Sequence, residues 1–221
     1  MYTITHSCDL ENQKEYEIKI TPPDEMANSF KTTEPVRYLR YHIEYIKYNY
    51  EVVCPEYITK DGTSTVVIPW FLIPGRPYPI QIYLFAIDLY STNPDIGQRA
   101  VAKATRLKFE LKKFAHTTVG RSFKALEQSR QRALKSRFGD ELKASAEETP
   151  LPSSAIENIV DNTQEKQENR RFPSVLEIAA RRRAMAKFLQ KFHNSIKKVG
   201  LKAAVQSLVK YWYRKTKRLL L

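Results

Sequence analysis

The segment Ile68–Ile80, IPWFLIPGRPYPI, contains four prolines in thirteen residues. Proline lacks a backbone N–H and fixes its own φ, so this density excludes both a helix interior and a central β-strand. The segment therefore separates two parts of the chain that fold differently. Before it, β-branched and aromatic residues predict strands, and after it apolar residues recur at helical spacing. The sequence predicts an α+β fold.

The part before the prolines predicts a small antiparallel sheet. Val36–Tyr50 is rich in Tyr, Ile and Val, Glu51–Val53 can extend it, and Thr63–Ile68 is a short β-branched run. Lys60-Asp61-Gly62 predicts a hairpin turn before the last of these runs, because glycine accepts a positive φ. Residues 1–35 are expected to form an N-terminal extension.

The net charge of +13 is confined to two parts of the chain. Residues 97–139 carry 12 basic and 2 acidic side chains, and residues 170–221 carry 15 and 1, whereas residues 1–96 and 140–169 are net acidic. In both basic blocks the charges alternate with apolar residues at helical spacing. A polyanion, either nucleic acid or an anionic membrane surface, is the natural partner of such helices. A solvated helix face is the alternative interpretation.

Two helices are predicted in the first basic block. Asn93-Pro94 is a helix-start signal for a helix that runs to about Phe109, Glu110–Ala115 forms a loop, and a second helix begins near His116 and can extend to Phe138. This arrangement matches a helix-turn-helix, in which the second helix enters the major groove of DNA. The connection is about six residues rather than the usual three or four, and an ordinary helical hairpin with a charged surface is the alternative.

The second of these helices carries the candidate DNA-reading side chains. Its apolar residues recur at i, i+4 and i+7 from Val119 and are expected to face the core, which places Thr117, Thr118 and Arg121 outward. Arg121 is the candidate for bidentate contact with guanine, and the two threonines for phosphates or a thymine methyl group. The residues expected to neutralise phosphates are Lys103, Arg106, Lys108, Lys112, Lys113 and Lys124.

Two segments resemble a known but poorly characterised family. Gln98–Gln128, QRAVAKATRLKFELKKFAHTTVGRSFKALEQ, resembles the helix-turn-helix segment of transposase-like proteins of Gram-positive bacteria that contain a domain of unknown function. Pro69–Pro74, PWFLIP, resembles an isoleucine- and proline-rich segment of the same family. The resemblance covers about residues 36–130 and implies DNA binding of mobile-element ancestry. It also implies a zinc-ribbon-like cysteine pair, of which this chain has Cys54, with Tyr57 where the second cysteine would stand.

The sequence predicts neither a metal site, nor a cofactor, nor catalysis. A structural zinc site takes four N or S ligands in closely spaced pairs, whereas Cys8, Cys54 and four scattered histidines make no second pair. The ribbon-like segment 36–79 is therefore expected to have lost its metal. Asp88 and Asp95 flank helices that look structural, so no pair of carboxylates suits two-metal phosphoryl transfer. Neither a phosphate-binding glycine loop nor a catalytic-triad signature occurs, and no small-molecule substrate is expected.

The second basic block is open to several interpretations. Ser174 is expected to cap a helix, Gly200 to break or kink it, and Leu201–Leu221 to form a second basic amphipathic helix. An apolar stripe on the first helix predicts docking on the main domain or homodimerisation, with the basic face on DNA. Alternatively, the protein is an interaction or membrane-surface protein whose basic helices bind a partner helix or anionic lipid. The stripe consists of Val175, Ile178, Met185, Leu189, Phe192, Ile196 and Val199.

Targeting and membrane signals are absent from the sequence. No stretch approaches the roughly 20 uncharged apolar residues of a membrane-spanning helix, and the start MYTITHSCDLENQ lacks the features of a secretory signal. A non-enzymatic, cytoplasmic protein that binds double-stranded DNA with sequence preference is therefore expected. Its predicted organisation is an N-terminal extension (1–35), a small β segment (36–79), a helix-turn-helix domain (80–139), an acidic linker (140–173) and a basic helical tail (174–221).

Overall fold

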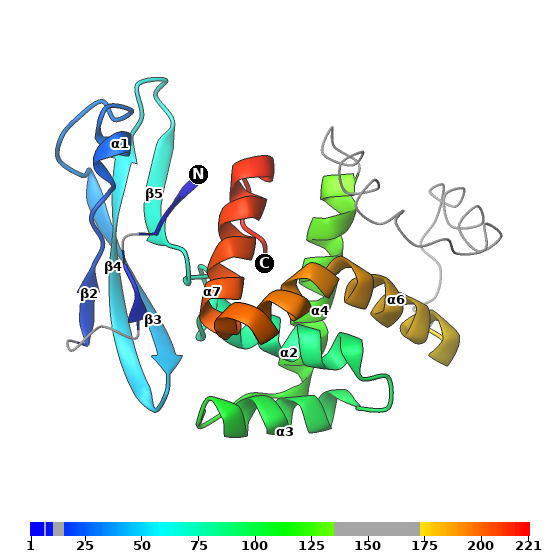
Figure 1. The fold of residues 1–221 in the computed structure, drawn as a ribbon. Helices are drawn as coiled ribbons and strands as arrows, with labels where there is room; N and C mark the ends of the chain where they lie inside the picture. The colour runs from blue at the N-terminus through cyan, green and yellow to red at the C-terminus, as the bar shows by residue number, and fades with distance from the viewer. Residues whose placement is uncertain (7, 11–15, 135–172) are drawn as a thin grey trace, which may run out of the picture.

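The computed structural model describes residues 1–6, 8–10, 16–134 and 173–221. Five strands form one sheet and the helices gather beside it, which confirms the α+β class (Figure 1). The strands are β1 (Tyr2–Thr5), β2 (Glu17–Lys19), β3 (Arg37–Tyr45), β4 (Tyr48–Ile58) and β5 (Ser64–Pro69). The helices are α1 (Asp24–Ala27), α2 (Ile80–Thr92), α3 (Gln98–Lys108), α4 (His116–Leu134), α6 (Val175–Phe188) and α7 (Gln190–Thr216).

The sheet is mixed rather than purely antiparallel. β4 pairs antiparallel with β3 and β5, as the two hairpins require, but β1 pairs parallel with β5 and β2 pairs parallel with β4. Residues 1–35, expected to be an extension, thus supply two strands. These strands are only three and four residues long. A strand that short shows too few alternations for a period of two to stand out in the sequence.

The run predicted as one strand from Val36 through Tyr50 is interrupted by a turn at Ile46 and Lys47. Both residues have positive φ, 46° and 64°, a conformation that costs a residue with a Cβ roughly 1–2 kcal/mol. Hairpin turns of this kind usually carry Asn or Gly, so nothing in the local sequence indicates one here. The predicted turn at Lys60-Asp61-Gly62 is confirmed, with Gly62 at φ 84°.

The proline-rich segment connects the sheet to the helices. The proline density favours an extended connection, but the segment makes two tight turns, in which the N–H of Leu72 donates to the carbonyl oxygen of Pro69 and the N–H of Arg76 to that of Ile73, each at 3.1 Å. Trp70 and Phe71 are buried. The indole Nε1 of Trp70 donates to the carbonyl oxygen of Cys8 at 3.1 Å, on the sheet side. On the helix side, Nη1 of Arg76 donates to Oγ of Ser122 at 2.9 Å, within α4. The segment is therefore anchored at both ends.

Helix α2 forms the centre of the helical part. The sequence predicts one apolar face on it, including Ile80, Leu84 and Ile87, but ten of its residues are buried. Helices α3, α4, α6 and α7 all pack against it. A helix that is apolar on nearly every side fits such a central position.

The predicted helix start at Asn93-Pro94 is wrong. α2 continues to Thr92 and Asn93 is its C-cap, while α3 begins at Gln98 after Gly97. Asparagine is common at both ends of helices, so the residue type alone does not distinguish a start from an end. Most of the predicted acidic linker, 140–173, and the expected continuation of α4 to Phe138 lie outside the described residues.

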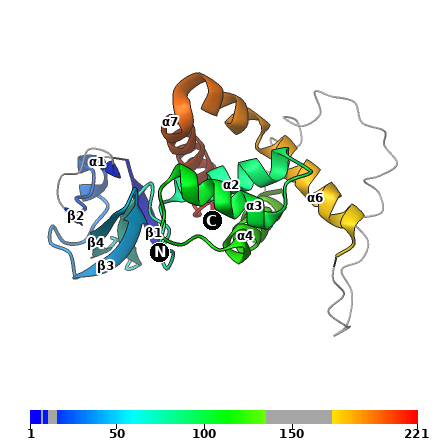
Figure 2. The same cartoon turned by 90° about the horizontal axis from the view of Figure 1, so that it is seen from below.

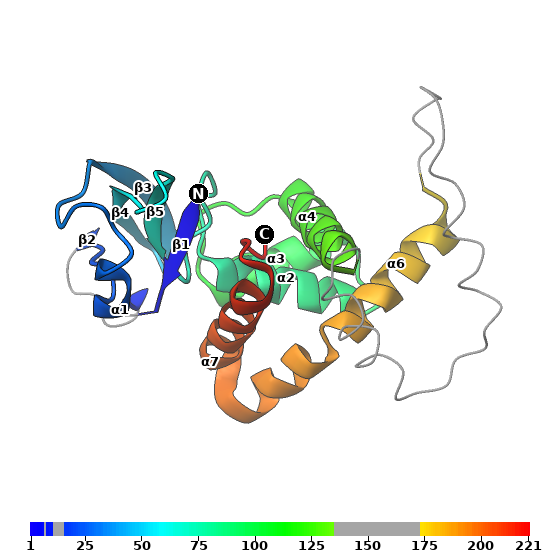
Figure 3. The same cartoon turned by 90° about the horizontal axis from the view of Figure 1, so that it is seen from above.

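The predicted basic tail is an integral part of the fold. The Ser174 capping box is present, and Gly200, at φ 83°, kinks α7, both as predicted. α6 and α7 form an arch that crosses α2 and returns toward β1 (Figure 3). At its end, the hydroxyl of Tyr213 donates to the carbonyl oxygen of Tyr2 at 3.1 Å. The last helix thus contacts the first strand.

The apolar stripe of the C-terminal helices serves mainly for packing within the chain. Met185, Leu189 and Phe192 are buried in the common core, whereas Val175 and Val199 remain exposed. The centre of the stripe is therefore docked on the main domain, as one interpretation predicts, whereas its two ends are not.

Arg182 fixes α6 to the end of α2. Its guanidinium donates to the carbonyl oxygens of Tyr90 (2.8 Å), Pro94 (2.9 Å), Ile96 (3.2 Å) and Asn93, and lies 4.1 Å from the centroid of the Tyr90 ring. A helix leaves its last carbonyls without intrahelical partners, and its C-terminus attracts positive charge. One buried arginine meets both needs here. In the sequence it is the middle of three arginines, and nothing there distinguishes it.

Candidate nucleic-acid interface

Helices α2, α3 and α4 form a three-helix unit that carries the predicted interface (Figure 2). The face of α4 that was expected to point inward does so, because Val119, Phe123 and Leu126 are buried. Val101 of α3 and Phe109 after it are buried as well. Aromatic contacts join the three helices: the ring centroids of the Phe85–Phe109 and Tyr90–Phe123 pairs each lie 5.5 Å apart. These contacts fix the orientation of α4, and hence which of its residues face solvent.

Helices α3 and α4 approach closely at Gly120. A Cβ atom at this position would lie only 3.0 Å from Oε1 of Gln98, the first residue of α3. Because glycine has no side chain, the first half of α4 can lie directly against the start of α3.

The connection between the two helices is held in place by the sheet. Oε1 of Glu44 in β3 accepts from the backbone N–H of Lys112 at 3.0 Å, and Lys47 in the β3–β4 turn pairs with Glu110 at 2.8 Å. The hydroxyl of Tyr78 donates to the carbonyl oxygen of Lys113. The connection, which runs from Phe109 to Ala115 and is longer than that of a usual helix-turn-helix, is thus stabilised by contacts from outside the helix pair. Sequence reasoning did not identify these contacts, since the residues that make them are remote along the chain.

The predicted site residues of α4 share one side of the helix. Thr117, Arg121 and Lys124 are exposed, and Thr118 beside them is half-buried. Spacings of four and three residues place the first three on a single face. The structure therefore brings together the side chains that the sequence selects for base and phosphate contact.

The remaining predicted cations surround α4 from its neighbours. Lys103 and Arg106 are exposed on α3, and Lys112 and Lys113 are exposed on the connection that leads into α4. Lys108 is also exposed, but its Nζ lies 5.2 Å from the centroid of the Phe85 ring, so its ammonium group is directed toward α2.

The positive charge of this region is not neutralised locally. Its two acidic residues pair with cations from elsewhere: Glu110 with Lys47 and Glu127, in a bidentate contact, with Arg181 of α6. Within the described part of residues 97–139, no lysine or arginine forms an ion pair. On the sheet, by contrast, Arg37 and Arg40 both pair with glutamates. A strong positive field therefore surrounds α3 and α4, whereas the sheet cations are compensated.

Sequence reasoning missed two further cations, Arg132 on α4 and Arg218 after α7. Arg132 lies eleven residues after Arg121, which is close to three helical turns, so the two share a face. This spacing in the sequence could have identified Arg132 as a residue on the Arg121 face of the helix. At Arg132, α4 meets Arg218 at the end of α7 across a cavity of about 400 Å³. No local pattern indicates that Arg218 approaches α4, since the approach depends on the path of the whole C-terminal arch.

The carboxylate of Asp88 plays a structural part in joining α2 to α7. Its Oδ2 lies 2.9 Å from Nδ1 of His193, while its buried Oδ1 has no hydrogen-bond partner. Burial raises the pKa of the Asp88 carboxyl above its usual range, despite the opposing effects of His193 and Lys197. Asp95 is exposed. Across the described residues, no three His, Cys, Asp or Glu side chains gather as metal ligands would.

Asp88→Asn is expected to stabilise the protein at pH 7.5 and to have a much smaller effect at pH 3.5, below the ordinary pKa of 3.8 for this carboxyl. The pKa of Asp88 is higher in the folded state than in the unfolded state, so the folded protein binds the proton more tightly and loses stability as pH rises through that range. An amide avoids this loss and retains an oxygen that can accept from His193. Thermal melting of both proteins at the two pH values measures the difference. A variant that is less stable at both pH values would contradict the expectation.

Within the described residues, no helix combines the length and apolar character needed to cross a membrane. Comparison with protein-family models, curated proteins and solved structures gives no significant match for this chain.

Proposed function

We propose that this chain is a non-catalytic cytoplasmic protein that binds double-stranded DNA, with sequence preference, through α3 and α4. The observation that carries the proposal is the exposed face of α4, with Thr117, Arg121 and Lys124 on a helix whose orientation is fixed by packing and whose surroundings hold uncompensated positive charge. The resemblance of Gln98–Gln128 to transposase-like proteins supports a transposon-related ancestry for this activity.

In this proposal, the first half of α4 enters the major groove. Arg121 donates two hydrogen bonds to one guanine, and Thr117 and Thr118 contact a phosphate or a thymine methyl group. The positive end of the α4 dipole also favours phosphate near its first turn. The cations of α3, of the connection and of α4 that neutralise the backbone are Lys103, Arg106, Lys112, Lys113 and Lys124.

The use of the C-terminal apolar residues favours DNA over a lipid surface as the partner. A helix that lies on a membrane inserts its apolar face into the lipid. Here Met185, Leu189 and Phe192 are buried against the rest of the chain. A membrane or a second copy of the chain would have to compete with the core for them, whereas binding to phosphates requires only the exposed cations.

Arg121→Ala and Lys113→Ala are expected to affect DNA binding differently. Arg121→Ala should reduce base discrimination at one position by about 1–3 kcal/mol, because a bidentate contact to a base is lost. Lys113→Ala should weaken all sequences alike, since a phosphate contact carries no sequence information. The measurement is selection of bound duplexes from a random pool, followed by titration of enriched and scrambled sequences.

Arg183→Ala is the matched control, because Arg183 is exposed on α6, outside the proposed interface. It should leave both affinity and preference unchanged. Equal effects of Arg121→Ala on every sequence would contradict the base-reading role, and no binding to any duplex would contradict the proposed function itself.

A further inference from the structure

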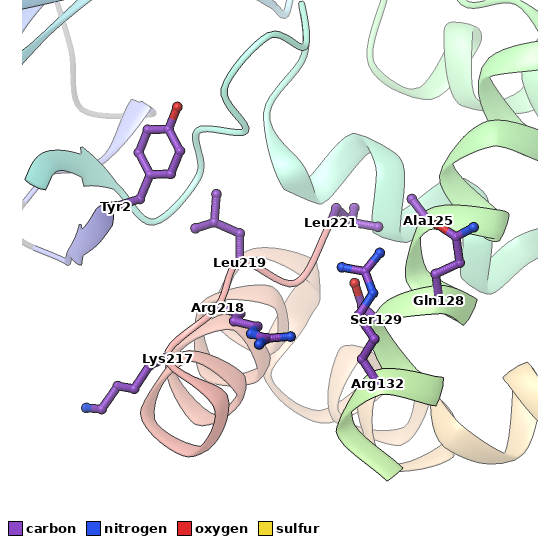
Figure 4. Close-up of a pocket in the computed structure, with 9 residues that line it drawn as sticks. All are labelled: Tyr2, Ala125, Gln128, Ser129, Arg132, Lys217, Arg218, Leu219 and Leu221. Carbon is purple, nitrogen blue, oxygen red and sulfur yellow. The ribbon is translucent and has the colours of Figure 1, made fainter. Parts of the chain in front are cut away.

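The cavity between α4 and the end of α7 has a mixed lining, in which Tyr2, Ala125, Leu219 and Leu221 lie beside cations and polar groups. Gln128, Ser129 and Arg132 contribute from α4, and Lys217 and Arg218 from the end of α7. Figure 4 shows Arg218 extending toward α4 and Arg132 rising from α4 toward the same space, while Lys217 points away from both. The cavity therefore has two guanidinium groups directed into it, together with a hydroxyl and an amide.

In the part of the chain that the structure describes, neither of these guanidinium groups has an acidic partner. No ion pair joins Arg132 or Arg218 to any carboxylate of the described residues. Two arginines that face a common space repel each other unless an anion lies between them. Planar guanidinium groups favour oxyanions such as phosphate, which can accept two hydrogen bonds from each.

The position of Arg218 is fixed by the structure that follows α7. Lys217 adopts a left-handed conformation, φ 54°, which ends the helix. The backbone N–H of Arg218 then donates to Oγ1 of Thr216 at 3.2 Å, and Leu220 is buried in the common core. Arg218 is therefore held between a helix end and an anchored residue rather than at a free end of the chain.

The cavity continues the face of α4 that carries Arg121. Arg132 lies about 16 Å further along the helix axis, at 1.5 Å per residue. In the proposed function the first half of α4 meets the base edges, so a residue about 16 Å further along the helix axis lies outside that half, on the side of the sugar–phosphate backbone. The spacing matches a backbone phosphate rather than a second base.

We propose that this cavity is a phosphate-binding site, in which Arg132 and Arg218 together hold one backbone phosphate of a DNA duplex. The assignment to DNA rests on the proposed function, whereas the recognition of phosphate rests on the two guanidinium groups alone. The site would join the two basic blocks of the sequence on one ligand.

The test compares Arg132→Gln/Arg218→Gln with Arg183→Gln/Lys187→Gln in the full-length protein. Both pairs are exposed and remove the same charge, but the second lies on α6. The first variant should bind a duplex about tenfold more weakly at 0.1 M salt, by analogy with the loss of one good charged contact. The slope of log affinity against log salt should become shallower by about 1, because one phosphate contact is lost. The control variant should match the unmodified protein in both respects.

Titration with inorganic phosphate gives a second, independent readout. The Nε–H NMR signals of Arg132 and Arg218 should shift together and saturate, while that of Arg121 should not. Shifts with phosphate but no duplex binding would overturn the proposed function and the assignment to DNA, and would leave a site for free phosphate. A different result would overturn the cavity site alone. In that case the protein binds a duplex, the two double variants bind it equally well, and phosphate shifts neither arginine signal. The proposed function would then still stand.

Discussion

Arg182→Ala is expected to lower the free energy of unfolding by about 3 kcal/mol or more, because a hydrogen bond from a charged group contributes about 1.5–3 kcal/mol and several are lost at once. Arg182 is buried and donates to the carbonyls of Tyr90, Asn93, Pro94 and Ile96. Alanine would leave these carbonyls without their donor at the junction of α2, α3 and α6. Urea denaturation followed by circular dichroism measures the change.

The neighbouring arginine provides the control for this experiment. Arg183 is exposed, and its replacement by alanine is expected to change stability by no more than about 0.5 kcal/mol, as for most surface substitutions. Arg182→Lys should fall between the two, since an ammonium group has fewer donors and lacks the planar fork of a guanidinium. Equal stability of the two alanine variants would show that Arg182 does not hold α6 on α2.

Raising the salt concentration from 50 to 200 mM is expected to weaken duplex binding by about a thousandfold. Binding that neutralises about six phosphates releases the counterions condensed on them, and this gives a slope of log affinity against log salt of about −5. Five of these contacts are expected from Lys103, Arg106, Lys112, Lys113 and Lys124, and the sixth from the phosphate that Arg132 and Arg218 hold together. Fluorescence anisotropy with a labelled duplex over this salt range measures the slope.

A combined Lys112→Gln/Lys113→Gln variant tests the origin of that slope. Both lysines are exposed on the connection, and loss of two phosphate contacts should make the slope shallower by about 2. The main-chain contacts of the two residues with Glu44 and Tyr78 do not depend on their side chains. Affinity that stays flat between 50 and 200 mM salt would contradict the account of binding by phosphate neutralisation.

The features predicted from sequence are those that depend on neighbours along the chain. The inward face of α4, the cap at Ser174, the kink at Gly200 and the turn at Gly62 all follow from local spacing or backbone preference. Exposure of the candidate residues on α4 follows from the same helical periodicity.

The features that were missed depend on contacts between distant segments. β1 and β2 are strands because they pair with β5 and β4, and their own sequences are too short to indicate it. The turn at Ile46 and Lys47 holds an unfavourable backbone conformation while Lys47 pairs with Glu110 and Tyr45 packs on Phe109. Such tertiary contacts override local preference, and they become visible only once the fold is known.

The contact between Tyr213 and Tyr2 has a consequence for how the molecule can assemble. The last helix completes a core that includes the first strand, and α2 is covered only when α6 and α7 have arrived. During synthesis, the apolar surface of α2 therefore stays uncovered until α6 and α7 have been made. For the same reason, a fragment that ends after α4 would keep the exposed residues of α3 and α4 but uncover the sides of α2 at Asp88 and Tyr90, which contact His193 of α7 and Arg182 of α6. The packing of α2 is thus coupled to the arrival of the last two helices.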